Sequence, residues 1–546
     1  MRTLILENLD FDDMLSNFKC LRVLKLSGHS IIELPNSIEQ LIHLRLLHIL
    51  HTKIEELPKS ITKLYNLQTL RIEECPNLMK PPEDLSNLIN LRHISINIVA
   101  QKEGFNLGCL IRLGYRDNLL KNMGQSTCLQ TLKFFGVGQE EGYRIKEMGP
   151  LKNLKGEINI YNLENVKDEE GAKSAKLKEK EIFKLDLFWS LIRRELDRFD
   201  KDEKVLEGLH PHPNLKSLTI EWYGGKKFPP WVNDLSLFHN LIHIKLNWCM
   251  ECEEVPPLGH LPCLRVLEIK GMGKVRSIGS EFYSYSDGSY RNTTTLFPSL
   301  RMLKLEQMYG LEEWKDAKEL IRAGEVLTVF PSLDELPSGL QFCASLQYLK
   351  IEYCPNLKSI PDLGELFHSL INLKLINSPY HQILKLSRRE GRLKTLVIEE
   401  LDAFPILHHP SIRYSHASLK KLILHGSPTL NSLPDEIQLF TALEELLIQD
   451  FDGMEALPNW LGIPSSLQKL SFYFCKKLIC LPILHLTNLK HLHIAFCPNL
   501  EKRCADVSGA EWFKIAHIPY IKINGKYIKG KDSEDSGDFY DSNLYD

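Results

Sequence analysis

The sequence lacks the features that mark several classes of protein. No stretch approaches the roughly 18 consecutive apolar residues that a membrane-spanning helix requires, and Met1 is not followed by the apolar segment of a secretory signal. Neither sign of charge dominates, because 67 Lys and Arg face 70 Asp and Glu and leave a net charge of -3. We therefore expect no nucleic-acid partner, no membrane partner and a cytoplasmic location.

Signs of metal, redox or nucleotide chemistry are also scarce. Thirteen cysteines are an odd number, so they cannot all form disulfides within one chain, and without a secretory signal reduced thiols are expected. Cys249 and Cys252 form a C-x-x-C pair, but no second pair or suitably spaced histidine pair accompanies it. His491 and His493 share one strand face without a further ligand. No G-x-x-x-x-G-K-[ST] loop and no catalytic triad stand out, so we expect no metal, no cofactor and no enzymatic activity.

What the sequence does contain is a repeat. Leu21-Arg-Val-Leu-Lys-Leu26 reads L-x-x-L-x-L, and the pattern returns at Leu44, Leu67 and Leu91, about 23 or 24 residues apart, the period of leucine-rich repeats. Later copies begin at Leu129, Ile182, Leu215, Leu241, Leu264, Leu300, Leu346, Leu370, Leu393, Leu419, Leu443, Leu467 and Leu489. With looser copies at Met1 and Leu154, the chain holds roughly nineteen coils.

The spacing inside each copy indicates how a coil is built. The fourth and sixth residues of L-x-x-L-x-L alternate inward, as a short strand requires. Three residues after the last apolar one comes a position whose side chain can turn toward the backbone of a neighbouring coil, and we call it the ladder position. It is occupied by Cys75, Cys249, Cys354, Cys475 and Cys497. Leu-Pro pairs such as Leu34-Pro35 and Leu433-Pro434 follow, and proline favours an irregular or short helical return over a second central strand.

The predicted fold is therefore an α/β solenoid. We expect a leucine-rich repeat horseshoe with a parallel concave sheet and an irregular or short-helical convex side, because one coil cannot bury its own leucines without neighbours. The copies divide into 1–127, with an insertion at about 97–127, 128–299, with a loop at about 271–297, and 300–528, with a closing cap. Residues 529–546 form an acidic tail that we expect to be disordered. Near 333–340 about one coil is lost, because a repeat strand runs directly into a Leu-Pro return.

Several blocks resemble a known family. They are Phe18–Ser27 with Ile32–Ile38, Leu151–Gly156 with Asn162–Val166, Pro256–Leu264 leading to Ile278–Tyr283, and Cys497–Cys504 with Trp512–Pro519. In this order they resemble the leucine-rich repeat region of plant intracellular disease-resistance proteins of the coiled-coil, nucleotide-binding class. The resemblance implies plant innate immunity, opening repeats that contact a nucleotide-binding switch domain, and later repeats that sense a pathogen effector or a guarded host protein. The switch itself is missing from residues 1–546, because no P-loop occurs in them.

Candidate partner-binding residues lie between the apolar positions of the strands, on the predicted concave face. The aromatic residues just before the ladder position are Trp189, Trp222, Trp248, Tyr353, Phe474 and Phe496. Because neighbouring strands lie about 4.8 Å apart, the three tryptophans are expected to form one aromatic patch, although such rings can also serve only to stabilise the sheet. The charged residues expected to set specificity are Asp186, Glu221, His243, Lys245 and Glu268.

The sequence thus predicts a protein-recognition module. Its partner would be an effector, a guarded host protein, or the switch domain in cis or in trans. The alternative is a free-standing leucine-rich repeat scaffold or decoy that binds a constitutive protein partner. A further interpretation is that the chain is the truncated product of a receptor gene.

Overall fold

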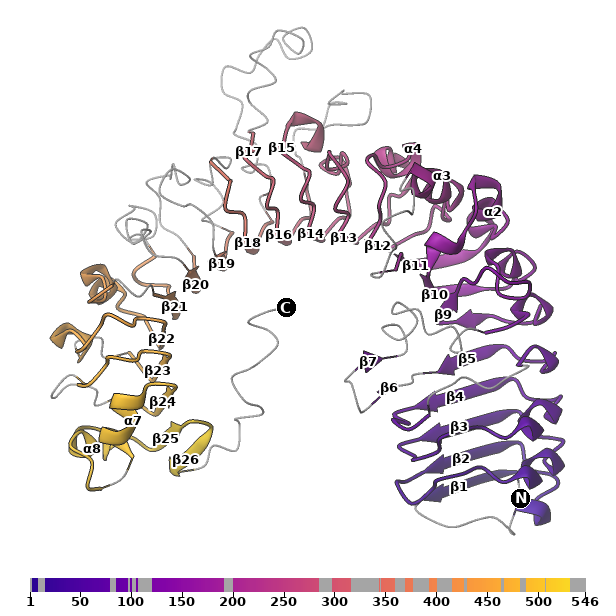
Figure 1. Ribbon diagram of the computed structural model, residues 1–546, viewed down its shortest axis with the longest axis horizontal. Helices are drawn as coiled ribbons and strands as arrows, with labels where there is room; N and C mark the ends of the chain where they lie inside the picture. The colour runs from indigo at the N-terminus through magenta and orange to yellow at the C-terminus, as the bar shows by residue number, and fades with distance from the viewer. Residues whose placement is uncertain are drawn as a thin grey trace, which may run out of the picture. The chain divides into compact units, whose positions relative to one another are not determined.

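The computed structural model describes most of the chain. The described residues are 2–7, 15–78, 85–96, 99–100, 105–106, 120–190, 200–283, 297–315, 343, 345–358, 369–376, 392–399, 415–426, 430–462, 466–481, 488–505 and 507–530. They fall into two compact units: Met1–Val275 with Ser284–Asn292 form unit 1, and Arg276–Tyr283 with Thr293–Asp546 form unit 2. In each unit, short parallel strands follow one another as coils (Figure 1).

Some expectations concern residues outside this description. They are most of the insertion at 97–127, the part 284–296 of the loop at 271–297, the segment 333–340, and the tail beyond residue 530. These expectations stay predictions.

Unit 1 holds two runs of parallel strands. The first is a six-stranded sheet in the order β1-β2-β3-β4-β5-β8, with bounds Thr3–Glu7, Val23–Ser27, Leu46–Leu50, Thr69–Glu73, His93–Ile96 and Thr131–Leu132. The second runs from β9 to β14, with bounds Phe134–Gly136, Lys155–Tyr161, Glu181–Phe188, Ser217–Glu221, His243–Asn247 and Val266–Lys270. A small antiparallel pair joins β6 (Val99–Ala100) and β7 (Phe105–Asn106).

Short helices form the returns of unit 1. The α-helices are α2 (Glu169–Lys173), α3 (Asp200–Gly208) and α4 (Pro230–Asn233). The 3-10 helices are η1 (Leu15–Asn17), η2 (Asn36–Gln40), η3 (Lys59–Lys63), η4 (Leu85–Asn87), η6 (Met123–Gln125), η7 (Ile145–Met148), η8 (Leu163–Asn165), η9 (Leu177–Glu179) and η10 (Leu235–Leu237).

Unit 2 continues the same construction in nine parallel strands. They are β16 (Met302–Glu306), β18 (Tyr348–Glu352), β19 (Asn372–Ile376), β20 (Thr395–Glu399), β21 (Lys421–His425), β22 (Glu445–Gln449), β23 (Lys469–Tyr473), β24 (His491–Ala495) and β25 (Tyr520–Ile523). β26 (Lys526–Lys529) pairs antiparallel with β25 and covers its edge. β15 (Ser277–Ile278) pairs with β17 (Glu313–Trp314). The helices are η11 (Ser280–Tyr283), η15 (Asp435–Leu439), η16 (Asn459–Gly462), α7 (Pro498–Cys504) and α8 (Trp512–Ile515).

The leucines of the repeat make the core. In β2, Leu24 and Leu26 are fully buried, whereas Val23, Lys25 and Ser27 between them are half-buried. Leu24 lies in register with Leu47 of β3, which is itself in register with Leu70 of β4. Stacking in register lets each coil bury the leucines of the next. The predicted leucine-rich repeat solenoid with parallel strands is confirmed.

The ladder cysteines behave as their spacing predicts. All five are fully buried, and their thiols face backbone carbonyls at the ends of strands. Cys475 Sγ, for example, lies 3.4 Å from the oxygen of Tyr473 and 3.9 Å from that of Ile448 in the preceding coil. The twelve cysteines in the described residues are all free thiols.

Proline starts several of the returns. Pro35, Pro58 and Pro434 each stand just before a 3-10 helix, with φ values between -63° and -69°. Asparagine side chains then tie neighbouring returns together: Asn66 Nδ2 donates to the oxygen of Ile42 at 2.7 Å, and Asn90 Nδ2 donates to that of Tyr65 at 2.7 Å. No helix in the described part of the chain combines the length and apolar character needed to cross a membrane.

Candidate protein-binding face

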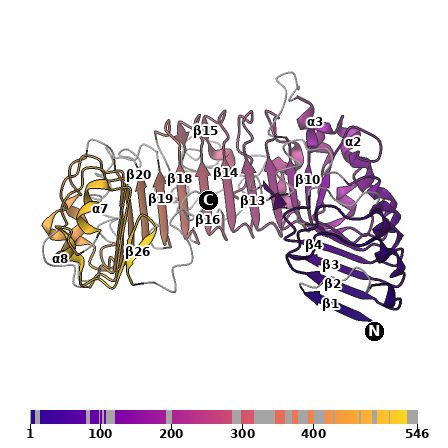
Figure 2. The same cartoon turned by 60° about the horizontal axis from the view of Figure 1, so that its bottom comes forward.

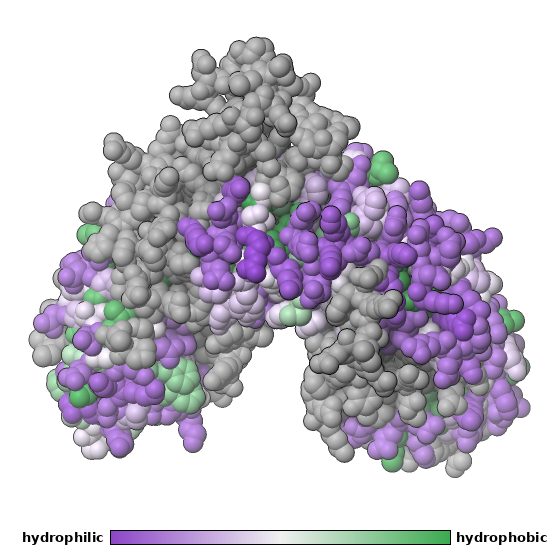
Figure 3. All heavy atoms as spheres, turned by 45° about the horizontal axis from the view of Figure 1, so that its top comes forward, coloured by the Kyte–Doolittle hydropathy of each residue, from purple (hydrophilic) through white to green (hydrophobic). Residues whose placement is uncertain are grey.

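The candidate site lies on the side of the sheet that points away from the leucine core. We call this side the open sheet face; it carries the first, third and fifth residue of each five-residue repeat strand, as in the half-buried Val23, Lys25 and Ser27 of β2. In Figure 2 the repeat strands within each unit are seen as successive ribbons. In the view of Figure 3, the described surface of unit 1 is mostly hydrophilic.

In unit 1, the predicted charged residues gather on three neighbouring rows of β11–β14. Asp186, Thr219, Lys245 and Glu268 lie in register on four consecutive strands. His243 lies one row before them, in register with Ser217, and Glu221 lies one row after, in register with Asn247. Parallel pairing in register therefore brings five predicted residues from distant parts of the sequence onto one surface.

Asp186 is the most enclosed of these charges. Its side chain is hydrogen-bonded to Thr219, and its Oδ2 lies 3.8 Å from Lys184 Nζ. Burial is the main cause that raises the pKa of Asp186 above its usual value, and the hydrogen bond and Lys184 oppose it. A partner that donates a hydrogen bond here would favour the carboxylate form.

His243, Lys245 and Glu268 form a looser group. Glu268 Oε1 lies 3.8 Å from His243 Nε2, and its Oε2 lies 3.9 Å from Lys245 Nζ. Burial lowers the pKa of His243, and Glu268 partly offsets this. The side chains of His243, Lys245 and Glu268 are 35%, 36% and 21% exposed, so partner groups can reach them while screening keeps their ion pairs weak.

Two of the three predicted tryptophans stack at the ends of their strands. The indoles of Trp222 and Trp248 have centroids 5.2 Å apart and an interplanar angle of 10°. Both backbones are left-handed, with φ of 60° and 53°, and each amide donates to the next coil: Trp222 to the oxygen of Asn247 at 2.9 Å, and Trp248 to that of Lys270 at 2.6 Å. Both side chains are half-buried, so one part of each ring stays accessible.

Trp189 does not join this pair. Its side chain is fully buried and packs edge-on against Tyr223, with centroids 5.2 Å apart and planes at 65°. Although Trp189 follows β11 as Trp222 follows β12, its φ is not positive, so the backbone sends its ring into the core. The expected patch of three indoles is therefore corrected to a pair, and Trp189 cannot contact a partner in this fold.

In unit 2, the aromatic residues at the same position fall into two places. Phe474 and Phe496 stack with centroids 4.5 Å apart and planes at 1°, and Phe496 is 49% exposed. Tyr353 lies at the other end of the run, on the coil of β18, where it packs against the buried residues Ile376, Val397, Ile423 and Leu447. The aromatic column of unit 2 is thus not continuous.

Two residues near the candidate site, Gly271 and Lys350, were not predicted from the sequence. Gly271 follows β14 at the position of Trp248, with φ of 71°, and leaves room for that indole. Lys350 of β18 is fully buried, with its Nζ 2.8 Å from Glu306 and 2.5 Å from Glu352. The sequence held no signal that Lys350 is buried: Lys304, Lys350 and Lys374 occupy the same place in three successive copies, a pattern typical of an exposed row.

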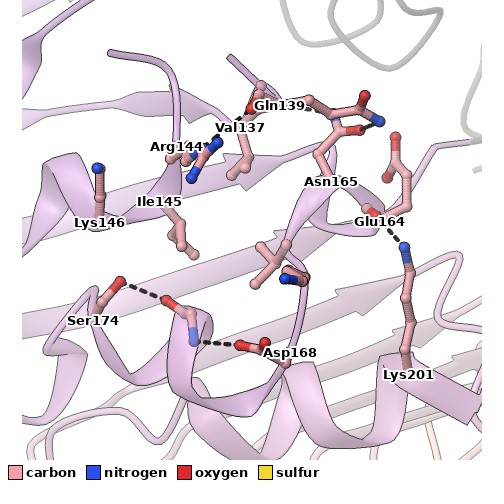
Figure 4. A pocket seen from close by; sticks show the side chains of 14 residues that line it. Val137, Gln139, Arg144, Ile145, Lys146, Glu164, Asn165, Asp168, Ser174 and Lys201 are labelled. Carbon is pink, nitrogen blue, oxygen red and sulfur yellow. Dashed lines mark hydrogen bonds between the residues drawn. The ribbon is translucent and has the colours of Figure 1, made fainter. Parts of the chain in front are cut away.

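A cavity of about 750 Å³ lies in unit 1 beside α2 and α3 (Figure 4). Its polar lining is largely engaged within the protein. Lys201 Nζ donates to the oxygen of Glu164 at 2.7 Å, Arg144 Nε donates to that of Gln139 at 3.2 Å, and the Asp168 carboxylate caps Gly171 at 2.8 Å. We therefore treat it as a structural hollow and not as the main site.

The residues weighed for metal binding have structural surroundings. Cys249 and Cys252 are fully buried, and Cys252 Sγ lies 3.1 Å from the oxygen of Gly225. His491 stacks on Tyr520 at 4.9 Å, and His493 is buried. Within the described residues, no group of three or more His, Cys, Asp or Glu is arranged to hold a metal ion.

The amino-acid sequence of this chain is similar to those of several known proteins. Residues 145–272 match a family model described as R13L1/DRL21 LRRs. A Solanum bulbocastanum protein named as disease resistance protein RGA4 is 33% identical over 94% of this chain and 47% of its own length. An Arabidopsis thaliana protein named as disease resistance RPP13-like protein 1 is 32% identical over 61% of this chain and 31% of its own. The chain spans less than half of the length of either relative.

Among solved structures, the Leptospira interrogans LRR protein LIC12759 aligns with 87% of this chain and 84% of that chain, at 16% identity and a TM-score of 0.33. We therefore base the family relationship on the two plant proteins and not on this structural alignment.

Proposed function

The chain belongs to the family of plant disease-resistance proteins, where it corresponds to their leucine-rich repeat region, and we propose that it recognises a protein. The partner is either a pathogen effector or a guarded host protein, and recognition takes place in the cytoplasm. It works by binding and not by catalysis. The open sheet face of β11–β14 in unit 1 is the proposed contact surface.

The observation that carries this proposal is the Trp222–Trp248 stack beside the charged rows. Tryptophan is enriched among the few interface residues that supply most of the binding energy, and such residues are typically surrounded by polar groups. The two half-buried indoles stand at the end of strands whose open face carries Lys245 and Glu268. Charges of both signs favour a partner of complementary mixed charge and give it a fixed register.

Regulation of a nucleotide-binding switch is the second part of the proposal. In the opening coils, Lys25, His48 and Arg71 lie in register on β2, β3 and β4, and we assign the contact with the switch to this row. Partner binding can move the switch only through different affinities for its two states; a shift from 1:99 to 99:1 needs a ratio of about 10⁴. The switch would be supplied in cis or in trans.

Capture from plant extracts tests the recognition surface. The native chain, a Trp222→Ala/Trp248→Ala variant and a Trp460→Ala control are immobilised and exposed to extracts of inoculated and uninoculated leaves, and bound proteins are quantified by mass spectrometry. Trp460 is a matched control because it lies on the return helix η16 of unit 2, hydrogen-bonded to Asp435 at 2.8 Å. A protein that binds the native chain and the control, and is depleted about tenfold or more with the double variant, supports the proposal.

Calorimetry with that protein, once purified, then gives the affinities. Equal capture by all three chains would place recognition elsewhere. A protein retained only from inoculated leaves supports an effector as the partner, whereas one retained equally from both is a host protein, either the guarded protein or the constitutive partner of the scaffold alternative. For the switch, the transcript upstream of Met1 decides between cis and trans: an in-frame P-loop domain supports the arrangement in cis.

A further inference from the structure

The open sheet face of unit 2 has a charge pattern that the proposed contact surface of unit 1 does not share. Six lysines lie at the first and third positions of its strands, and we call them the lysine band: Lys304, Lys350, Lys374, Lys421, Lys469 and Lys522. Only one carboxylate, Glu445, lies at these positions. The glutamates Glu306 and Glu352 lie at the fifth position instead. Lys350 is fully buried and paired with Glu306 and Glu352, so the other five lysines make the half of this face at which the strands begin basic.

An apolar stretch interrupts the band. Val397, Ile423 and Leu447 occupy the third position of β20, β21 and β22, between Lys374 on one side and Ser471 on the other. The tyrosines Tyr353 and Tyr473 pack against this stretch and remain partly exposed. Val397, Ile423 and Leu447 are themselves buried, so the apolar surface that a ligand can reach in the middle of this face is that of the two tyrosines. A ligand for this face therefore needs carboxylates at both ends and aromatic or aliphatic groups over the tyrosines.

Neighbouring ammonium groups in the band repel one another. Burial lowers the pKa of Lys374, and the neighbouring ammonium groups of Lys350, Lys304 and Lys421 lower it further, against the opposing effect of Glu352. Lys421 and Lys469 share the single carboxylate of Glu445, at 3.1 and 3.6 Å. An added anionic group would relieve this repulsion.

The chain carries a segment with the required chemistry directly after β26 and Gly530. Residues 531–546 hold six carboxylates against one lysine, together with Phe539, Tyr540, Leu544 and Tyr545. Gly530, which precedes the segment, has φ of 65° and lies against the oxygen of Pro519 and the ring of Tyr520. Since Tyr520 begins β25, the chain leaves the β25–β26 hairpin at the end of the strands where the lysine band runs.

The segment is long enough to follow the band. Sixteen residues span at most about 53 Å when extended. Seven strand spacings separate β25 from β18, or about 34 Å at 4.8 Å each. Linkage to the same chain raises the effective concentration of such a segment to the millimolar range, which favours it over a free acidic peptide of equal affinity.

We propose that the acidic segment 531–546 docks in cis on the lysine band of unit 2, with its aromatic and aliphatic side chains over Tyr353 and Tyr473. The docked segment acts as an internal pseudoligand: it covers this face until a partner with higher affinity displaces it. The inference concerns unit 2 and does not rest on the recognition surface assigned to unit 1.

A fluorescein-labelled peptide with the native sequence of 531–546 tests the proposal by anisotropy. It is titrated with the native full chain and with an amide chain, which carries Asp532→Asn, Glu534→Gln, Asp535→Asn, Asp538→Asn, Asp541→Asn and Asp546→Asn. Because the native segment already holds its site, we expect the native chain to bind the peptide at least tenfold more weakly than the amide chain. Binding to the amide chain should fall as NaCl rises from 50 to 300 mM.

Charge reversal in the amide chain then locates the site. Lys374→Glu/Lys522→Glu should weaken peptide binding at least tenfold, whereas the control Lys394→Glu/Lys502→Glu, with the same change of charge at exposed positions outside the strands, should weaken it less than threefold. Thermal melting confirms folding, and Lys374→Gln/Lys522→Gln replaces the reversal if it unfolds the chain. Equal binding by native and amide chains, no binding by the amide chain, or equal losses in variant and control would each overturn the proposal.

Discussion

Gly271 lies directly against the indole of Trp248. A Cβ atom on Gly271 would fall 2.3 Å from Cε3 of Trp248 and 2.8 Å from Cδ2, and the glycine also has a left-handed φ of 71°. Because Trp248 stacks in turn on Trp222, this glycine fixes where the aromatic pair stands.

Substitution of this glycine should disturb the stack. Gly271→Ala is expected to lower the free energy of unfolding by about 1–2 kcal/mol, because it adds strain at a left-handed residue and displaces the ring. Urea unfolding measures the loss, and tryptophan fluorescence reports the moved indole. Gly273→Ala is the matched control, since a Cβ there meets no atom within 4 Å; a similar loss in both variants would contradict this reasoning.

Trp189 and Trp248 should respond differently to truncation. Trp189 is fully buried, so Trp189→Ala should cost about 3–5 kcal/mol of unfolding free energy, as large-to-small core substitutions do. Trp248→Ala removes a half-buried ring and should cost markedly less. Denaturant unfolding of the two variants compares their losses of unfolding free energy. If Trp248→Ala is as destabilising as Trp189→Ala, the aromatic pair is part of the packing and the recognition surface loses its main support.

Lys350 should be among the most sensitive charges of unit 2. Lys350→Met leaves Glu306 and Glu352 buried without their cation, which typically costs about 3–5 kcal/mol. Lys358→Met, which breaks a pair with Glu312 at 2.9 Å between exposed side chains, should cost far less, because solvent screens exposed ion pairs. Chemical unfolding at pH 7 compares the two. A further variant, Lys350→Met/Glu306→Gln/Glu352→Gln, should recover part of the loss because no buried charge remains.

His425 should make unit 2 sensitive to acid. Burial lowers the pKa of His425 to about 4, so between about pH 6.5 and 4 the unfolded chain binds a proton that the folded chain does not. Stability is therefore lost as the pH falls through this window, by on the order of 2–3 kcal/mol from this group. His425→Leu should reduce the loss between pH 7 and 4.5 in denaturant melts, whereas the exposed His517→Leu should leave it as in the native chain. Parallel losses in all three would show that other groups control the acid response.

The sequence predicted the coil well because the coil is a local pattern. Leu24 and Leu26 point inward, and Cys75 and Cys475 turn to backbone carbonyls, for reasons of spacing alone. It also predicted that parallel register would gather Asp186, Lys245 and Glu268 on one face.

The direction of Trp189 could not be predicted in this way. Trp189, Trp222 and Trp248 hold equivalent sequence positions, but only the last two have a positive φ, and the sign of φ depends on how the chain continues into the return. The buried ion group of Lys350 was missed for a related reason: three successive lysines suggest an exposed row, and only the register with Glu306 and Glu352 shows that the middle one is enclosed.

The antiparallel strand β26 also bears on how such proteins diversify. Every other strand of this sheet in unit 2 pairs parallel with its neighbours, and a parallel strand leaves an edge on which one more coil can be added. β26 occupies that edge in the opposite direction, so a duplicated repeat cannot be appended behind it without losing the hairpin. A coil inserted before β25 would leave this hairpin intact, would shift all the later coils along the stack, and would alter which face residues stand together.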